Sequence, residues 1–173
     1  MTVPRTPHQA GAFLIGLWIA FCLSSLTVKV ATADGRATQG TAELEVALLE
    51  QVNAVRASHH LIPLRRAAEL DRVAKAHSLD MVRRNYLSHH DPEGGSPVDR
   101  VSRGGLEGFT LVAENLGMTD HPDPNAEIVS RWLQSPDHRR NLLAPPFNHT
   151  GIGIARGRNG SLVYTQVYVT IPR

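Results

Sequence analysis

The sequence contains a single cysteine, Cys22, and that residue lies inside an apolar stretch near the N-terminus. The rest of the chain has no thiol, which excludes a disulfide framework, a cysteine nucleophile and a thiolate metal site there. Small exported domains are often held together by disulfides. A domain built from the rest of this chain must instead be stabilised by its hydrophobic core.

Several signatures of enzymes are also missing. The sequence has no H-E-x-x-H pattern of zinc peptidases, no G-x-S-x-G nucleophile elbow and no phosphate-binding P-loop. Two glycines, Gly151 and Gly153, fall inside a predicted strand instead of a turn between a strand and a helix. We therefore interpret them as a place where two backbone segments approach closely.

Outside the N-terminal segment, basic and acidic residues balance. The chain has 18 Lys and Arg residues and 16 Asp and Glu residues, but Arg5 and Lys29 precede residue 33 whereas every acidic residue follows it. A neutral domain without a stripe of basic residues lacks the electrostatic footprint of nucleic-acid binding or of binding to an anionic membrane surface. We expect no nucleic-acid partner.

The N-terminal segment has the three parts of a secretory signal peptide. Arg5 supplies a positive charge, an apolar stretch follows over residues 11–28, and Ala31-Thr32-Ala33 is a small-residue cleavage site. This pattern predicts a signal peptide over residues 1–33, a polar linker over 34–40, and export to the extracellular space or the periplasm. An uncleaved membrane anchor remains the alternative, since the apolar stretch is near the lower length for a membrane span. After cleavage we expect no membrane span.

Residues 41–173 have the length of one domain, and their first half is patterned as helices. Apolar residues recur at helical spacing after Thr41, with Glu45 and Arg56 among the polar residues on the opposite face. Pro63 ends this pattern, and a second helix is predicted over residues 67–85. His77 lies on the apolar stripe of that helix, where we interpret it as a hydrogen-bonded core residue.

The second half turns from helical to strand patterning. Short helices are predicted over residues 97–103 and 125–133, and extended backbone over 109–117. Strands are predicted over residues 151–155 and 162–169, which flank Asn159-Gly160, the strongest short-range hairpin signal. This order predicts an α+β fold in which helices pack on a short antiparallel sheet.

Five segments, in chain order, resemble motifs of the CAP superfamily, the group of cysteine-rich secretory, antigen 5 and pathogenesis-related proteins that share the SCP domain. The segments are Tyr86–Gly94, Asp99–Val101 with Gly105, Ala113–Leu116, Trp132–Leu143, and Gly151-x-Gly153 followed by Tyr164–Val167. The Trp132–Leu143 run is similar to that of the bacterial branch. The resemblance implies a single domain over residues 41–173, folded as a three-layer α-β-α sandwich with a short, mainly antiparallel sheet.

The same resemblance implies a cleft lined by two histidines and neighbouring carboxylates, in which some members hold zinc. His89 matches the first histidine, Glu114 the glutamate and His138 the second histidine. We expect these three side chains to converge, with a weakly held or exchangeable Zn²⁺ as the implied cofactor. Four further residues are expected to adjoin a ligand in the cleft: Ser135, Asn115, Tyr164 and Gln166.

Three arrangements of this cleft are open. Two imidazoles and one carboxylate are the ligand set of several catalytic zinc sites. In a weaker arrangement Glu114 orients a histidine without touching an exchangeable metal. In a third, Glu114 bonds backbone amides and no metal is needed. Ser135 stands where many eukaryotic relatives have a second glutamate, which removes a candidate acid or base.

Three functions follow from these arrangements. The one we expect is a secreted binding module for a lipid, a peptide or a cell-envelope ligand, because it needs no nucleophile. The alternatives are a metal-assisted hydrolase of peptide or envelope polymer, and a structural or interaction domain without metal. The sequence does not decide whether the protein is an enzyme, and we expect that it is not.

Overall fold

A computed structural model describes residues 40–172, so the predicted signal peptide and nearly all of the linker lie outside the described residues. The helices are α1 (Thr41–Ser58), α2 (Ala68–Arg84), α3 (Pro97–Arg103), α4 (Pro124–Gln134) and α5 (Pro136–Leu142). The strands are β1 (Arg65–Arg66), β2 (Leu111–Thr119), β3 (His149–Arg156) and β4 (Leu162–Thr170). Between residues 40 and 172, no helix is both long and apolar enough to cross a membrane.

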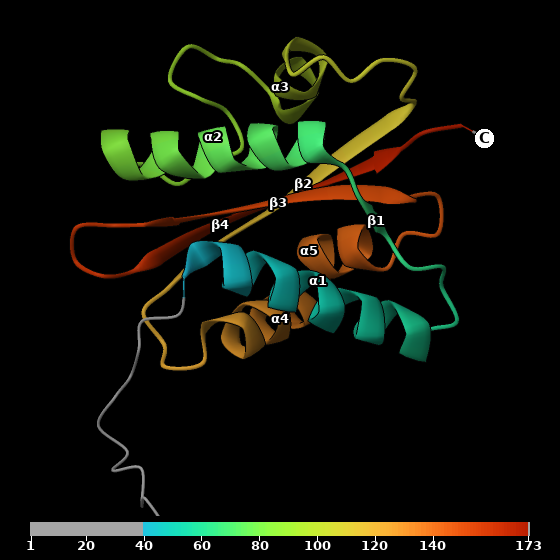
Figure 1. Cartoon of the computed structure of the whole chain (residues 1–173), viewed down its shortest axis with the longest axis horizontal. Helices are drawn as coiled ribbons and strands as arrows, with labels where there is room; N and C mark the ends of the chain where they lie inside the picture. Colours follow the sequence, from blue (N-terminus) through green and yellow to red (C-terminus); the bar gives the residue numbers. More distant parts are fainter. Residues whose placement is uncertain (1–39, 173) are drawn as a thin grey trace, which may run out of the picture. The chain divides into compact units, whose positions relative to one another are not determined.

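The four strands form one sheet in the order β1-β3-β4-β2. Pairs β2–β4 and β3–β4 are antiparallel, and only the two-residue β1 runs parallel to its neighbour β3. Helices α2 and α3 cover one face of the sheet, and α1, α4 and α5 cover the other (Figure 1). The predicted α+β sandwich with a mainly antiparallel sheet is therefore confirmed. Strand β1 and helix α5 were not predicted. Strand β1 has only two residues, and α5 follows α4 after the single residue Ser135, so no separate periodic run marks it.

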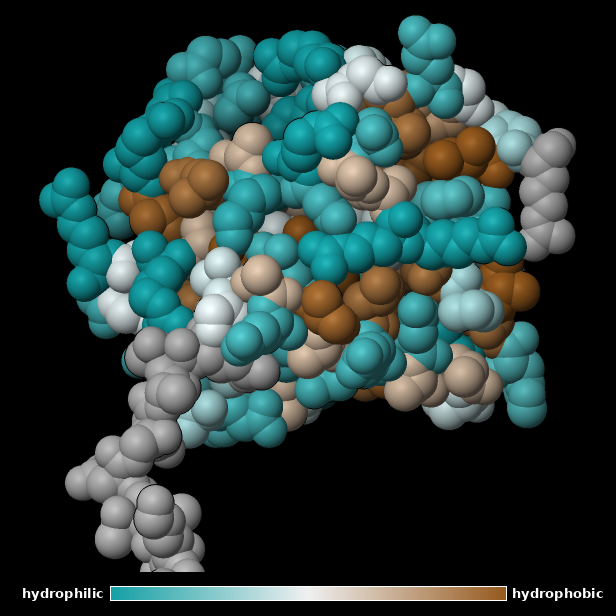
Figure 2. Space-filling model, viewed as in Figure 1, coloured by the Kyte–Doolittle hydropathy of each residue, from teal (hydrophilic) through white to brown (hydrophobic). Residues whose placement is uncertain are grey.

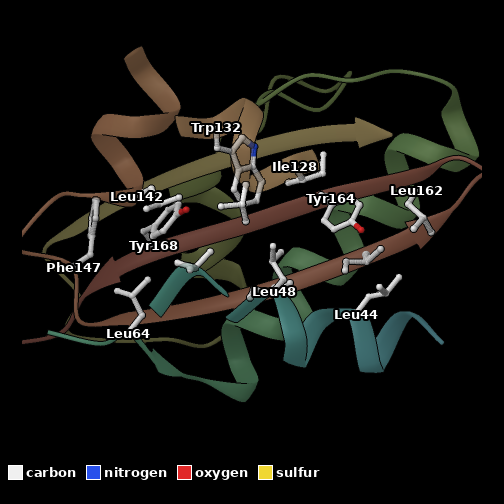
Figure 3. Packing of buried hydrophobic residues seen from close by; sticks show 14 residues of the cluster. Leu44, Leu48, Leu64, Ile128, Trp132, Leu142, Phe147, Leu162, Tyr164 and Tyr168 are labelled. Atoms are coloured by element: carbon white, nitrogen blue, oxygen red, sulfur yellow. The ribbon is translucent and has the colours of Figure 1, made fainter. Parts of the chain in front are cut away.

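Each face of the sheet has its own hydrophobic core. The larger core lies against α1, α4 and α5 and includes Trp132, Tyr164 and Tyr168 (Figure 3). On the other face, residues of α2 and α3 pack against Val167 and Val169 of β4. Successive residues of β4 thus point to opposite layers, as the pleat of a strand requires. The same alternation sends neighbouring side chains of β2 to opposite faces.

Side chains close the outer edge of β3 where β1 does not cover it. Glu45 Oε1 accepts hydrogen bonds from the Ile154 amide (3.0 Å) and from Lys75 Nζ (2.9 Å), and Lys75 also donates to the Ile154 carbonyl (2.6 Å). Asp71 Oδ1 accepts from the Ile152 amide at 2.9 Å. Figure 2 shows a band of hydrophilic residues between the layers of α2 and α1. An open edge is a template for pairing with another chain, and these contacts block it.

The predicted polar face of the first helix is wrong at two positions. Glu45 and Arg56 are buried, at 8% and 0% exposure. Glu45 bonds the edge of β3, and the Arg56 guanidinium donates to four carbonyl oxygens, those of Ile62, Leu142, Ala144 and Phe147. Helical periodicity separates polar from apolar residues, but it does not reveal that a polar residue meets backbone groups of another segment.

Candidate functional site

Glu114 lies at the centre of a polar cluster on the α2 and α3 face of the sheet. Its side chain is 1% exposed. Oε1 accepts a hydrogen bond from His89 Nδ1 at 2.9 Å, and Oε2 accepts one from Arg100 Nη2 at 2.9 Å. Both carboxylate oxygens are therefore occupied, and the carboxylate is fixed between an imidazole and a guanidinium.

Arg100 also holds the loop that carries His89. The same Nη2 donates to the His89 carbonyl at 2.9 Å, and Nη1 donates to the Gly95 carbonyl at 3.1 Å. Arg100 thus contacts the backbone of the loop at two points six residues apart and the side chain of Glu114 on β2. Arg100 and Glu114 together therefore hold His89 in place relative to the sheet.

Helix α3 begins in a way that fixes the position of Arg100. Ser96 Oγ accepts from the Asp99 amide, and Asp99 Oδ2 accepts from the Ser96 amide at 2.8 Å, which forms a capping box. Pro97 occupies the first helical position, where its missing amide proton is not needed. This start places Arg100 one turn into the helix, beside β2.

The hydrogen bond to Glu114 assigns the proton of neutral His89 to Nδ1. A carboxylate can only accept, so Nδ1 must be the donor and Nε2 keeps its lone pair. The His89 side chain is 46% exposed, whereas its partner Glu114 is buried. The Nδ1–H of His89 is therefore held by buried Glu114, while Nε2 of the exposed ring can accept a hydrogen bond from a ligand or bind a metal ion.

His77 belongs to the core beneath this cluster. It is 2% exposed, its Nε2 lies 3.0 Å from the Ser88 carbonyl, and it is 3.9 Å from Glu114 Oε1, too far for a hydrogen bond. Burial lowers the pKa of His77, which the charge of Glu114 opposes and that of Arg100 reinforces. The interpretation of His77 as a hydrogen-bonded core residue is confirmed.

His138 lies on α5, across the edge of β2 from His89. Ser135 occupies the N-cap position of α5, and Pro136 the first helical position. The Ser135 hydroxyl makes no capping hydrogen bond and lies instead 2.9 Å from His138 Nδ1. A hydroxyl can donate or accept, so either tautomer of His138 can be bonded. Burial lowers the pKa of His138, and the nearby His89 lowers it further, against the opposing charge of Asp137.

Asn115 builds the frame on the α5 face. Its Nδ2 donates to the His138 carbonyl at 3.0 Å and to the Tyr168 hydroxyl at 3.1 Å. Asn141 Nδ2 donates to Asn115 Oδ1 at 3.0 Å and to the Glu114 carbonyl at 3.2 Å. Two adjacent residues of β2 therefore hold the two histidines from opposite faces of the sheet. We call His89, Arg100, Glu114, Ser135 and His138 together the His–Glu site.

Three of the residues expected beside a ligand are instead buried. Asn115 on β2, and Tyr164 and Gln166 on β4, are each 0% exposed. The Tyr164 hydroxyl donates to Asn125 Oδ1 at 3.0 Å, and Gln166 Nε2 donates to Thr150 Oγ1 at 3.2 Å. Figure 3 shows the Tyr164 ring within the hydrophobic cluster. The reason is that β4 is an interior strand of the sheet and helices cover both its faces.

The geometry does not fit a three-ligand metal centre that includes Glu114. In the part of the chain that the structure describes, no three His, Cys, Asp or Glu side chains are grouped as ligands of one ion. Arg100 places a positive charge directly on the carboxylate that the third ligand would supply. The contacts match the arrangement in which Glu114 orients His89 from behind, because its Oε1 accepts from His89 Nδ1.

Sequence reasoning did not identify Arg100 as a site residue. Arg100 lies within one of the five resembling segments, but its contact with Glu114 joins residues 14 positions apart. No spacing rule reports such a contact, because it depends on how the loop before α3 returns to the sheet. The sequence signal that could have indicated Arg100 is its place one turn after Ser96, at the capped start of a helix.

Three comparisons place this chain among known proteins. A sequence profile of the cysteine-rich secretory protein family, abbreviated CAP, matches residues 49–168. The Bacillus subtilis protein YkwD is 32% identical over 143 residues, which are 83% of this chain and 53% of YkwD. The solved structure of an extracellular SCP-domain protein from Bacillus anthracis is 31% identical, with a TM-score of 0.64, over 75% of this chain and 42% of that one.

A further solved structure, an outer surface protein of Borrelia burgdorferi, has a TM-score of 0.70 at 20% identity, over 77% of this chain and 96% of that one. At that identity the likeness is one of fold alone. The match spans about half the length of YkwD and less than half the length of the Bacillus anthracis protein. Activities of those whole proteins therefore do not transfer directly to it.

Proposed function

The chain belongs to the cysteine-rich secretory protein family, and from that membership and the His–Glu site we propose that it is an exported binding module. The observation that carries the proposal is the state of Glu114. Both of its oxygens accept hydrogen bonds, from His89 and Arg100, and its side chain is 1% exposed. The carboxylate supports a binding surface and is not free to act on a substrate.

A hydrolase would need a group that takes a proton from water at the site. A general base must lie within hydrogen-bond reach of the proton that it removes. Buried Glu114 lacks such access, whereas the exposed His89 imidazole, with Nε2 as acceptor, has it. Ser135 stands at the position of a second carboxylate, and its hydroxyl is engaged by His138. Because neither a nucleophile nor a second carboxylate is assigned to act with His89, we propose binding without turnover, through the imidazoles of His89 and His138.

The two imidazoles define what the site would bind. A neutral imidazole nitrogen ligates divalent metals and accepts hydrogen bonds from N–H and O–H groups. Zn²⁺ held by two histidines would leave coordination positions for water and exchange readily, since structural zinc sites use four protein ligands. Lipid, peptide and cell-envelope ligands offer the hydrogen-bonding groups in the absence of a metal.

Zinc binding is the direct test of the site. We expect His89→Ala and His138→Ala each to weaken Zn²⁺ binding at least about tenfold, because each removes one of two nitrogen ligands. The measurement is titration calorimetry on protein purified without chelator. His90→Ala is the matched control, because His90 is exposed, adjacent to His89, and makes no side-chain hydrogen bond in the described structure. Equal losses of Zn²⁺ affinity for His89→Ala and His90→Ala would reject His89 as the ligand. No Zn²⁺ binding by the unmutated chain would reject Zn²⁺ as the cofactor.

Export is the second part of the proposal. It rests on the signal-peptide pattern of residues 1–33, and the Bacillus anthracis relative is described as extracellular. Mass spectrometry of protein recovered from the producing cells should find a mature N-terminus at or within a few residues of Asp34. Intact Met1 on a membrane-bound chain would support the anchor alternative.

A further inference from the structure

Arg100 links the backbone and the side chain of the same residue, His89. One guanidinium nitrogen, Nη2, donates to the His89 carbonyl and to Glu114 Oε2, each at 2.9 Å. Glu114 Oε1 in turn accepts from His89 Nδ1 at 2.9 Å. These three hydrogen bonds form a closed circuit from the His89 backbone through the guanidinium and the carboxylate to the His89 ring. The circuit fixes the ring relative to its own backbone.

The circuit is shielded from water at its charged end. The side chain of Arg100 is 10% exposed and that of Glu114 is 1% exposed. Hydrogen bonds between charged groups in such surroundings are shorter and stronger than those between neutral groups. Arg100 Nε is buried with no hydrogen-bond partner among the described residues. The guanidinium is therefore placed so that its Nη atoms serve Glu114 and the loop, although its own Nε donor is left unsatisfied.

We propose that Arg100 is the positioning residue that sets the tautomer of His89, and with it the ligand class of the His–Glu site. By holding Glu114 in place as an acceptor, Arg100 keeps the His89 proton on Nδ1 and leaves Nε2 as an electron-pair donor. The site then selects groups that accept an electron pair, namely divalent cations and N–H or O–H donors, over anions. Only this last step rests on the proposed function, because the tautomer is a property of the ligand-free chain.

His138 provides an internal reference. Its Nδ1 is bonded to the Ser135 hydroxyl, which serves as donor or acceptor. No carboxylate fixes the tautomer of His138 in this contact, and Arg100 makes no hydrogen bond to it in the described structure. A substitution of Arg100 is therefore expected to change His89 and to leave His138 as it was.

The test is the tautomer of His89 in ligand-free protein, read from long-range ¹H–¹⁵N correlation spectra at about pH 8, above the ordinary histidine pKa of about 6.5. The unmutated chain should show His89 protonated on Nδ1. Arg100→Met should lose that single tautomer while His138 is unchanged. Arg103→Met is the matched control, because Arg103 is on the same helix with a side chain 67% exposed, and it should resemble the unmutated chain.

Arg100→Lys separates this role from a purely structural one. An ammonium can keep a charged hydrogen bond to Glu114 but cannot span the three acceptors of the guanidinium. We expect Arg100→Lys to restore the Nδ1-protonated tautomer. Retention of that tautomer in Arg100→Met would overturn the proposal, and so would its loss in a folded Arg100→Lys. If Arg100→Met fails to fold, the neutral Arg100→Gln takes its place with the same expectation.

Zinc titration of the same proteins distinguishes this inference from the proposed function. We expect Arg100→Met to bind Zn²⁺ at least about tenfold more weakly, the usual effect of removing support for a ligating histidine. If Arg100→Met changes the tautomer but the unmutated chain binds no Zn²⁺, the role of Arg100 stands and the proposal that the site binds Zn²⁺ is rejected. If the unmutated chain binds Zn²⁺ but the tautomer does not depend on Arg100, Zn²⁺ binding stands and the role of Arg100 is rejected.

Discussion

Replacing Arg56 by methionine is expected to lower the free energy of unfolding by about 3–5 kcal/mol, a loss large enough to threaten folding at body temperature. Arg56 is completely buried, and its guanidinium donates to four carbonyl oxygens at 2.8 to 3.2 Å. Methionine fills much of the volume but donates no hydrogen bond. The carbonyls at the end of α5 and before β3 would then be buried without partners.

Arg56 is buried without a carboxylate partner among the described residues, which is unusual for a charged side chain. Burial lowers the pKa of Arg56, which the nearby Tyr168 opposes, yet arginine stays protonated in proteins. The carbonyl oxygens take the place of water around the cation. They come from the segment after α1, from the last residue of α5 and from the segment between α5 and β3. Arg56 therefore joins two segments about ninety residues apart, where the chain has no disulfide to do so.

Urea unfolding followed by circular dichroism measures this loss. Arg72→Met is the matched control, because Arg72 is on α2 with a side chain 66% exposed and, among residues 40–172, pairs only with Glu69. The control should change the free energy of unfolding by less than about 0.5 kcal/mol. If Arg56→Met differed from this control by less than about 1 kcal/mol, the carbonyl contacts would not be what holds the two segments together.

Periodicity and turn chemistry predicted most of the helices and strands, whereas the three-layer sandwich was implied by the family resemblance. The helix predicted over residues 125–133 is α4, Pro124–Gln134, and the predicted hairpin joins β3 and β4. Gly160 adopts a φ of +85°, which explains the Asn159-Gly160 signal at that turn. Local patterns succeed here because each element buries one stripe of side chains against a neighbour, and that stripe is visible in the sequence.

The site was only partly predictable. The resemblance directed attention to His89 and Glu114, which the structure brings within 2.9 Å. Tyr164 and Gln166 were expected beside a ligand because they alternate along one strand, yet alternation does not reveal that a helical layer covers that face. Arg100 was not identified, and Arg56 was placed on the polar face, for a related reason. Their partners, the Glu114 carboxylate and backbone carbonyls, come from segments whose positions depend on the whole tertiary fold.

Two glycines of β3 decide how closely helix α2 approaches the sheet. A Cβ added at Gly153 would overlap backbone atoms of Ala74 and Lys75, and one added at Gly151 would overlap backbone atoms of Leu70. Ser78 Oγ donates to the Gly153 carbonyl at 2.8 Å, which confirms that the helix lies directly on the strand. The interpretation of Gly151-x-Gly153 as a close backbone approach is therefore confirmed.

Gly153→Ala is accordingly expected to lower the free energy of unfolding by about 3 kcal/mol or more, at the upper end of the usual cost of overpacking. The obstructing atoms are helix backbone, so no side-chain rotation relieves the overlap and all of α2 must move away from β3. At a position with space, the same change would stabilise the chain by about 0.4–1 kcal/mol, because it restricts the unfolded state.

Gly117→Ala, on β2, is the matched control for this prediction. Its added Cβ would meet the terminal methyl of Ile128, which can rotate aside, so a loss of about 1 kcal/mol is expected. Urea unfolding of both variants decides the matter. Equal losses would mean that α2 can shift as readily as a side chain can rotate. A larger loss for Gly153→Ala would establish that the close packing of α2 on β3 depends on the missing side chain.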